Sequence, residues 1–594
     1  APLIGFPASD GRREVATAGI LSNRECASAT LRDRASQIAF YRLRPVDTLE
    51  GVRTFRSSAL PPLVSSRRCR MLRVLTLACV VASCCPAASA VAVEPLRLRI
   101  DRLIDAGYTG PKAPPADDAE LLRRTYLDIV GRIPTVAEAR AYLDDRSPEK
   151  RLRLVDRLLQ SAEHPRRLTE AFHAMLMERR GDHDEWLRYL QASFEKNKPW
   201  DVLVREIIDP SADDAATRGA AWFAVNRLSK VGQQETDYPG LTRDVGRMFL
   251  GMDLQCAQCH DHLFIDDYKQ PDFQGLYTVF LNTAIRTDVQ FPALTENLMS
   301  KKIEFMSVFT KEPKQTGPRV PGMVEVSIPS FPAGDEYLVK PDKKTKVLGV
   351  PKFSPLEAVA RDLTSPQNRA FRENLANRLW WLTMGRGLVE PLDQFHRGNP
   401  PTHPELLALL GDEIVARKFD LNALLRELYL SETYARGGRW TAADKPRPGS
   451  ATFAAANAKP LSAEQLFHAF LTAVGPNVGD LKTDDVRKKF VAAYANPAKE
   501  PEIEFAPSVK AALFLSNDST VLELLKPKAG NLVERLSKAA SPEAAAEELY
   551  LAVLSRRPTA DETADVRRLS AKYAVDRPKL FGHLAWSLLS STEF

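Results

Sequence analysis

The chain has 594 residues, of which 44% are hydrophobic and 27% charged, a composition typical of globular proteins with roughly two to four domains. The net charge of +6 arises in the first 90 residues, which hold 13 Arg and 6 acidic residues. The remaining residues carry 69 basic and 70 acidic side chains, a balance that excludes nucleic-acid binding through a basic face. We therefore expect no nucleic-acid partner.

The first 90 residues have the features of a leader. Met71 is the first methionine, and residues 71–90 have the pattern of a signal peptide. Arginines at 67–73 precede an apolar run at 74–83, and the small residues 88–90 form a cleavage site. We expect residues 1–70 to be a disordered or non-native leader and the mature protein to be exported to the periplasm or cell envelope.

Two further expectations concern the membrane. The apolar run is far shorter than the roughly 20 residues that a spanning helix needs, and no later segment reaches that length, so we predict no membrane span. The alternative to a cleaved signal is a lipoprotein, because Val81-Ala-Ser-Cys84 also fits a lipoprotein cleavage site. In that case a lipid on Cys84 anchors the protein to a membrane.

The fold class predicted for the rest of the chain is mainly α-helical and multi-domain. We expect a helical N-terminal domain at 95–284, a small Pro-rich β-containing insertion or linker at 285–353, and a helical C-terminal domain at 354–594. Amphipathic stretches predict helices near 151–160, 167–178 and 185–208, and a helix ending near Gly251. Alternating residues predict a strand at 324–328, with 302–310 a weaker candidate.

One sequence pattern occurs twice, near residue 130 and again near residue 555. The segment Tyr126-Leu-Asp-Ile-Val-Gly-Arg-Ile-Pro-Thr135-Val-Ala-Glu138 recurs as Tyr550-Leu-Ala-Val-Leu-Ser-Arg-Arg-Pro-Thr559-Ala-Asp-Glu562. Both copies preserve a helix end, a Pro-Thr turn and a capping box, in which a Thr side chain and a Glu three residues later bond each other's backbone N–H groups. We predict that the copies form similar helical hairpins.

The chemically distinctive motif is Cys256-Ala-Gln-Cys259-His260. In such a CxxCH segment the two thiols add across the vinyl groups of a haem and the histidine binds the iron, because one helical turn presents all three side chains together. If the signal is cleaved after Ala90, Cys256 and Cys259 are the only cysteines that remain. We therefore predict one c-type haem held by these two cysteines, with His260 as the proximal ligand.

Two other interpretations of the motif stay open. Cys256 and Cys259 could form a local disulfide, or the thiols could join His260 and His262 around zinc or non-haem iron. A tetrahedral metal site needs ligands on both sides of a turn, and the two histidines flanking Asp261 meet this need if the segment is a loop. The protein would then be a structural or binding module.

The sequence leaves the sixth ligand of a haem iron undetermined. Met299 and Met306 follow the motif at plausible distances, and Met252 is close to it. A methionine ligand would raise the reduction potential, whereas an open position would favour ligand binding or catalysis. For His396 and His403, in a Pro-rich turn, we expect capping or hydrogen bonding in preference to metal binding.

The sequence resembles the planctomycete cytochrome-c-like family of large exported proteins, whose N- and C-terminal parts are paired domains of unknown function. The N-terminal resemblance rests on residues 121–135, Asn197-Lys-Pro-Trp200-Asp201 and Cys256-Ala-Gln-Cys-His-Asp-His262. The C-terminal resemblance rests on Asn377-Arg-Leu-Trp380, Gly385-Arg-Gly-Leu-Val-Glu-Pro391 and Asn399-Pro-Pro-Thr-His-Pro-Glu-Leu406. This chain departs from the family at His262-Leu263-Phe264, where His-Pro-Phe is usual, and in the segment 171–181.

The resemblance implies an envelope protein with no assigned reaction. We expect electron transfer or redox support of another envelope protein, with a redox partner whose identity the sequence does not give. A haem or metal enzyme with an open iron position is a further hypothesis, so the sequence leaves enzymatic activity undecided.

Overall fold

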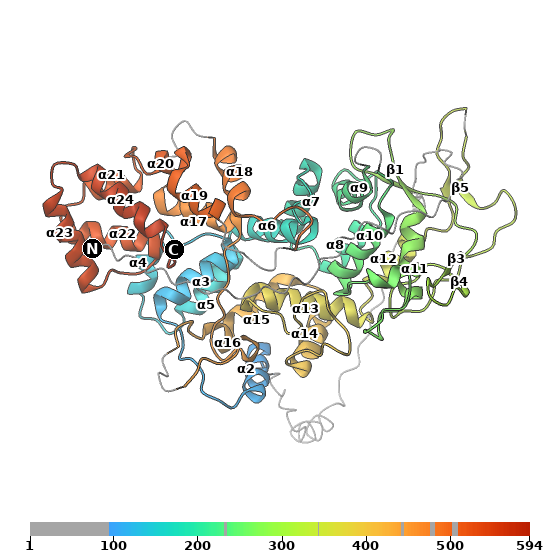
Figure 1. Cartoon of the computed structure of the whole chain (residues 1–594), viewed down its shortest axis with the longest axis horizontal. Coiled ribbons are helices and arrows are strands. Elements are labelled where there is room, and N and C mark those ends of the chain that lie inside the picture. The colour runs from blue at the N-terminus through green and yellow to red at the C-terminus, as the bar shows by residue number, and fades with distance from the viewer. Residues whose placement is uncertain (1–93, 231–233, 343, 441–444, 476–481, 502–508) are drawn as a thin grey trace, which may run out of the picture. The chain divides into compact units, whose positions relative to one another are not determined.

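The computed structural model describes residues 94–230, 234–342, 344–440, 445–475, 482–501 and 509–594 (Figure 1). The predicted leader, the signal peptide and Cys84 lie outside the described residues. In these residues the fold is mainly helical with three small sheets in the middle region, which confirms the predicted fold class. Within the described ranges, no helix combines the length and apolar character needed to cross a bilayer.

The helices before the sheets are Leu96–Gly107 (α2), Asp118–Val130 (α3), Val136–Asp144 (α4), Lys150–Leu159 (α5), Glu163–Met177 (α6), Asp184–Glu195 (α7), Trp200–Ile208 (α8), Trp222–Leu228 (α9), Tyr238–Val245 (α10) and Gln270–Leu281 (α11). Among them lie two 3-10 turns and one π-helix, Arg218–Ala221 (η1), Cys256–Gln258 (η3) and Gly246–Leu250 (η2). The stretch predicted as one helix at 185–208 is two helices, α7 and α8. Asn197 adopts a left-handed φ of 45° and Pro199 precedes the second helix, so the first helix cannot continue.

The sheets are three antiparallel pairs, β1 with β2, β3 with β4 and β5 with β6. Their strands are Thr283–Ile285 (β1), Leu294–Glu296 (β2), Ile303–Met306 (β3), Pro313–Thr316 (β4), Tyr337–Val339 (β5) and Val350–Pro351 (β6). The weaker strand candidate at 302–310 contains β3, whereas the prediction of a strand at 324–328 is wrong. Val324 is exposed, and Val326 donates a single backbone hydrogen bond, to Pro318, since the prolines around this segment cannot donate to a ladder.

The helices after the sheets are Pro355–Leu363 (α12), Arg369–Met384 (α13), Pro404–Ala416 (α14), Leu421–Leu430 (α15) and Glu432–Ala435 (α16). A 3-10 turn, Ser450–Thr452 (η4), leads to the last helices: Ala463–Val474 (α17), Thr483–Tyr494 (α18), Val509–Asn517 (α19), Ser519–Leu524 (α20), Leu532–Ser537 (α21), Pro542–Leu554 (α22), Ala560–Lys572 (α23) and Arg577–Leu589 (α24). Figure 1 shows the last group in orange and red, with α4 beside α22.

Two large hydrophobic clusters hold most of the helices in the described residues together. The first joins residues of α2–α11 to residues of α12–α16, so that α5 packs on α15, α8 on α12 and α13 on η2. The second joins helices α17–α24 and also includes Leu127 of α3 and Ile133 in the turn after it. The main core therefore crosses the predicted boundary between the N-terminal and C-terminal domains, and the predicted domain limits stay a prediction.

The repeated segments have the same local structure. The first helix of each copy, α3 or α22, ends at a left-handed residue, Gly131 or Ser555, and the second, α4 or α23, begins at Thr135 or Thr559 with a full capping box. In the first copy Arg132 pairs with Glu138 and Glu163. In the second copy Arg556 pairs with Glu562 and Glu593 at corresponding places. The predicted duplication of helical hairpins is confirmed.

Candidate functional site

The CxxCH motif follows a helix whose end is distorted. Helix α10 continues into the π-helix η2, and Gly251, with a left-handed φ of 69°, terminates it. Single-turn π-helices occur often at functional sites because they shift the side chains that follow. The predicted helix end near Gly251 is confirmed, and the chain then forms the 3-10 turn η3, which holds Cys256.

Both thiols of the motif lie at the surface. Cys256 and Cys259 are exposed and free, and they are three residues apart in one turn whose central Ala257 is buried. Ala257 belongs to a small apolar cluster with Leu254, Tyr268 and Phe273. The turn is therefore fixed from below while its sulfur atoms face solvent.

The segment from Gly251 to Asp253 is held by a segment from the second half of the chain. The Phe395 N–H donates to the Gly251 carbonyl at 2.9 Å, and the Asp253 N–H donates to the Asp393 carbonyl at 3.0 Å. A Cβ on Gly251 would lie 2.5 Å from the Phe395 ring, so the contact needs glycine for space as well as for its φ. The close pairing fixes where the cysteine turn begins.

A buried charge cluster supports the π-helix from behind. Asp244, 5% exposed, accepts from Arg227 at 2.6 Å, from Arg180 at 2.9 Å and from Arg247 at 2.9 Å. Burial alone would raise the pKa of this carboxyl, but the charges of Arg227, Arg247 and Arg180 hold it down to about 2. Arg247, in η2, also pairs with Asp393, so the cluster links α10 to the segment that holds Gly251.

The two histidines of the motif have different hydrogen-bond roles. The Nδ1 of His260 lies 2.6 Å from the Asp261 carbonyl, so it carries the proton and donates, and among the described residues nothing bonds the Nε2 lone pair. A metal-binding histidine characteristically donates its other ring N–H to such an acceptor. In contrast, the Nδ1 of His262 accepts the N–H groups of Phe264 and Ile265, at 3.2 and 3.0 Å, which leaves the proton on Nε2. His262 therefore caps a turn, whereas the hydrogen bond of His260 leaves its Nε2 as the nitrogen without a proton.

Large apolar side chains around the motif are exposed. Phe264 is 90% exposed, and Leu263 and Phe309 are each 63% exposed. The Phe309 ring centroid lies 4.7 Å from that of His260, and the backbone N–H of Val308 donates to the Cys259 carbonyl at 3.1 Å. Exposed apolar clusters of this kind mark binding surfaces. The loop after the motif and the turn after β3 thus form an apolar rim beside the thiols.

The methionines considered as iron ligands lie in different surroundings. Met306, at the end of β3, is 54% exposed. The Gln270 side chain donates both to the Met306 carbonyl, at 3.1 Å, and to the Gln258 carbonyl within the motif, at 3.5 Å. Met299 is buried, and Met252 is partly buried in the hydrophobic cluster beneath the turn. Met306 is the methionine that the structure brings to the rim.

The structure also brings His396 to the motif, which the sequence analysis did not foresee. The Tyr268 ring lies 6.0 Å from the His262 ring and 5.7 Å from the His396 ring, and the Tyr268 hydroxyl donates to the Phe395 carbonyl at 3.1 Å. Burial lowers the pKa of His396, the Asp267 carboxylate raises it and His262 lowers it further. His403 lies elsewhere, directly before α14, where its Nδ1 bonds the Thr402 hydroxyl.

No sequence signal could have placed His396 beside the motif, because the contact joins segments far apart in the chain. Across the described ranges, no group of three or more His, Cys, Asp or Glu side chains is arranged to hold a metal ion. The candidate set Cys256, Cys259, His260 and His262 is thus adjacent in sequence without forming a preassembled cage.

Comparison with known proteins gives two family matches. Residues 99–284 match a family model described as a protein of unknown function (DUF1549), and residues 357–502 match a second described as a protein of unknown function (DUF1553). The first match includes the CxxCH motif and the second includes the segment that pairs with Gly251. No curated protein and no solved structure matches the chain.

Proposed function

We propose that this chain, a DUF1549 domain followed by a DUF1553 domain, is an exported c-type-cytochrome-like protein with one haem bound covalently through Cys256 and Cys259. His260 would bind the iron, and the protein would transfer electrons or give redox support to a partner in the periplasm or cell envelope. The proposal extends the resemblance to the planctomycete cytochrome-c-like proteins. A bound haem would supply a one-electron redox couple at the surface.

One observation carries the proposal: two free, exposed thiols in a single turn are bordered by exposed apolar side chains. Leu263, Phe264 and Phe309 leave apolar area in water that a flat macrocycle would cover, a favourable burial. Each thiol adds to a vinyl group by breaking its S–H bond and forming a C–S bond, with the hydrogen going to the adjacent carbon. This addition needs no oxidant or reductant.

The histidine pattern favours haem over the compact metal site. The Nε2 of His260 is available for iron, whereas the Nδ1 of His262 already accepts hydrogen bonds from two backbone N–H groups. A zinc or non-haem iron site that uses His262 would have to break both bonds. Met306 is the side chain we propose for the sixth position, because it is exposed at the same rim.

The test is spectroscopic. Residues 94–594 are exported behind a heterologous signal in a bacterial host that carries enzymes for covalent haem attachment. We expect the denatured, reduced protein to show a c-type pyridine absorbance band, which is lost in the double variant Cys256→Ser, Cys259→Ser.

His262→Asn is the matched variant, since an Asn side chain can also accept backbone N–H groups in a tight turn. We expect it to retain the band in full. A colourless parent protein containing one zinc or iron per chain, with the metal lost in His262→Asn, would refute the haem proposal in favour of the non-haem site. A colourless, metal-free parent without titratable thiols would refute it in favour of a disulfide.

A further inference from the structure

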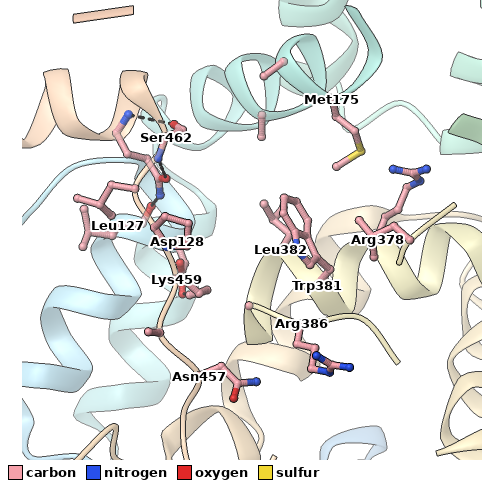
Figure 2. Close-up of a pocket in the computed structure, with 18 of the residues that line it drawn as sticks. Leu127, Asp128, Met175, Arg378, Trp381, Leu382, Arg386, Asn457, Lys459 and Ser462 are labelled. Carbon is pink, nitrogen blue, oxygen red and sulfur yellow. Dashed lines mark hydrogen bonds and ion pairs between the residues drawn. The ribbon is translucent and has the colours of Figure 1, made fainter. Parts of the chain in front are cut away.

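A cavity of about 1020 Å³ lies away from the CxxCH turn. It is bordered by α3, α6, α13 and the stretch 456–463, so both family-matched parts contribute to its walls. Figure 2 shows Trp381 and Leu382 on α13 across from Asp128 and Lys459, with Met175 above them. A volume of this size accommodates a small organic molecule.

One arginine in the wall of this cavity is buried without a partner. Arg167, on α6, is 5% exposed, its Nε has no hydrogen-bond partner, and it makes no hydrogen bond or ion pair with any residue that the structure describes. Other arginines of the same wall are paired, Arg124 with Glu120 and Arg378 with Asp393. Only Nε is among the fully buried atoms without a partner, so the two terminal nitrogens face the cavity, where an anion from outside the chain could pair with them.

Charges of both signs surround Arg167. Its charge helps to lower the pKa of Glu170 on the same helix, but that carboxylate already pairs with Arg166 and His468. Burial lowers the pKa of the neighbouring Lys459, Asp128 raises it again, and the charges of Arg124 and Arg167 lower it further. Arg386, in the same wall, lacks a carboxylate partner within the described residues and has an unpaired Nε. The carboxylate of Asp128 already pairs with Lys459 and accepts from the Tyr434 hydroxyl, so it does not neutralise Arg167.

The apolar part of the wall completes a two-sided site. Trp381 is partly exposed in the cavity, with Leu382 and Met175 near it. A flat indole face offers a large contact area at low entropic cost. Lys459 connects the two sides, because its ammonium also donates to the Thr383 carbonyl near the end of α13.

We propose that this cavity binds an organic oxyanion, whose carboxylate, phosphate or sulfate group pairs with Arg167 and whose apolar part lies against Trp381. The site is separate from the CxxCH motif and does not depend on haem. Arg167 supplies two parallel N–H donors of the kind that suits planar oxyanions.

The test uses phenyl phosphate as the probe. Inorganic phosphate and phenol, which carry its anionic and aromatic parts separately, are the comparison ligands. Calorimetry is done on the double variant Cys256→Ser, Cys259→Ser, so that no haem is required. We expect phenyl phosphate to bind at one site with a Kd of about 1 mM or tighter, and each half to bind more weakly.

Arg167→Met keeps an unbranched side chain as far as the position of Nε and removes the charged end, and it should weaken phenyl phosphate binding at least about 10-fold. Trp381→Leu should weaken phenyl phosphate but leave inorganic phosphate unchanged. Arg568→Met, at an arginine exposed on α23, is the matched control and should leave both affinities unchanged.

A stability measurement separates a binding role from a structural one. Because Arg167 has no partner in the free protein, Arg167→Met should melt at the same temperature as the parent or higher. The proposal fails if phenyl phosphate does not bind, if Arg167→Met binds it as well as the parent does, or if Arg167→Met no longer melts cooperatively. Arg167→Lys should keep much of the affinity for inorganic phosphate, since the charge remains.

Discussion

Gly251 shows how one residue fixes the start of the cysteine turn. Its φ of 69° and the 2.5 Å approach of a Cβ to the Phe395 ring are two separate demands for glycine. Gly322 has a similar φ of 76° but nothing within 4 Å of a Cβ. Substitution of Gly322 therefore tests backbone strain alone, whereas substitution of Gly251 tests strain together with crowding.

We expect Gly322→Ala to lower the free energy of unfolding by about 1 kcal/mol through strain alone. Gly251→Ala should lower it by at least about 1 kcal/mol more, because the Phe395 ring must shift out of a packed site. It should also change the rate at which Cys256 and Cys259 react with a thiol reagent, whereas Gly322→Ala should not. Urea unfolding and thiol titration measure both effects, and equal losses for the two variants would contradict the crowding argument.

At the scale of elements, the two hairpins share one electrostatic device. Burial raises the pKa of Glu138, but the Arg132 side chain and the Thr135 backbone hold it down to about 2. Hydrogen bonds from Arg556 bring the pKa of Glu562 down to about 2 as well. A carboxyl whose pKa is lower in the folded protein than in the unfolded chain stabilises the fold at every pH above its unfolded pKa. This contribution is lost as the pH falls toward the folded pKa of about 2.

Glu138→Gln and Glu562→Gln should each lower the free energy of unfolding by about 1 kcal/mol at neutral pH, since glutamine keeps the capping box but not the ion pair. The deficit should shrink as the pH falls from about 5 toward 2. Urea unfolding at several pH values measures this trend. Glu149→Gln, at an exposed residue, should show no deficit, and a Glu562→Gln deficit that stays constant with pH would contradict the assignment.

The elements also show what the sequence could predict. The capping boxes at Thr135 and Thr559 and the helix end at Gly251 were predictable, because local side chains determine them. The break near Asn197 and the missing strand at 324–328 were not predicted, since a left-handed turn and the prolines outweighed the apolar pattern. At the site, the cysteines and His260 could be predicted from local sequence, whereas the cavity at Arg167 and the position of His396 depend on packing between distant segments.

At the scale of the whole molecule, the two family-matched parts share one core. Helix α5 packs on α15, and the Trp200 N–H donates to the Phe419 carbonyl at 3.1 Å. Arg426 pairs with Asp156 across the same junction. Separating the parts would therefore expose a large apolar area to water.

We expect fragments 94–284 and 354–594 to lack cooperative thermal unfolding when each is expressed alone, and to regain it when they are co-expressed. Circular dichroism melting and size-exclusion chromatography measure this outcome. Two fragments that each melt cooperatively as monomers would show that the shared core is dispensable.

The pairing of Gly251 and Asp253 with Asp393 and Phe395 also has a consequence in time. During synthesis, the cysteine turn emerges long before the segment that receives it, by roughly 7 to 28 s at the usual rate of about 5–20 residues per second. During that interval Cys256 and Cys259 belong to a segment that cannot yet pair with Asp393 and Phe395. An enzyme that modifies the two thiols can therefore act on them in an unfolded segment, before they become part of the folded surface.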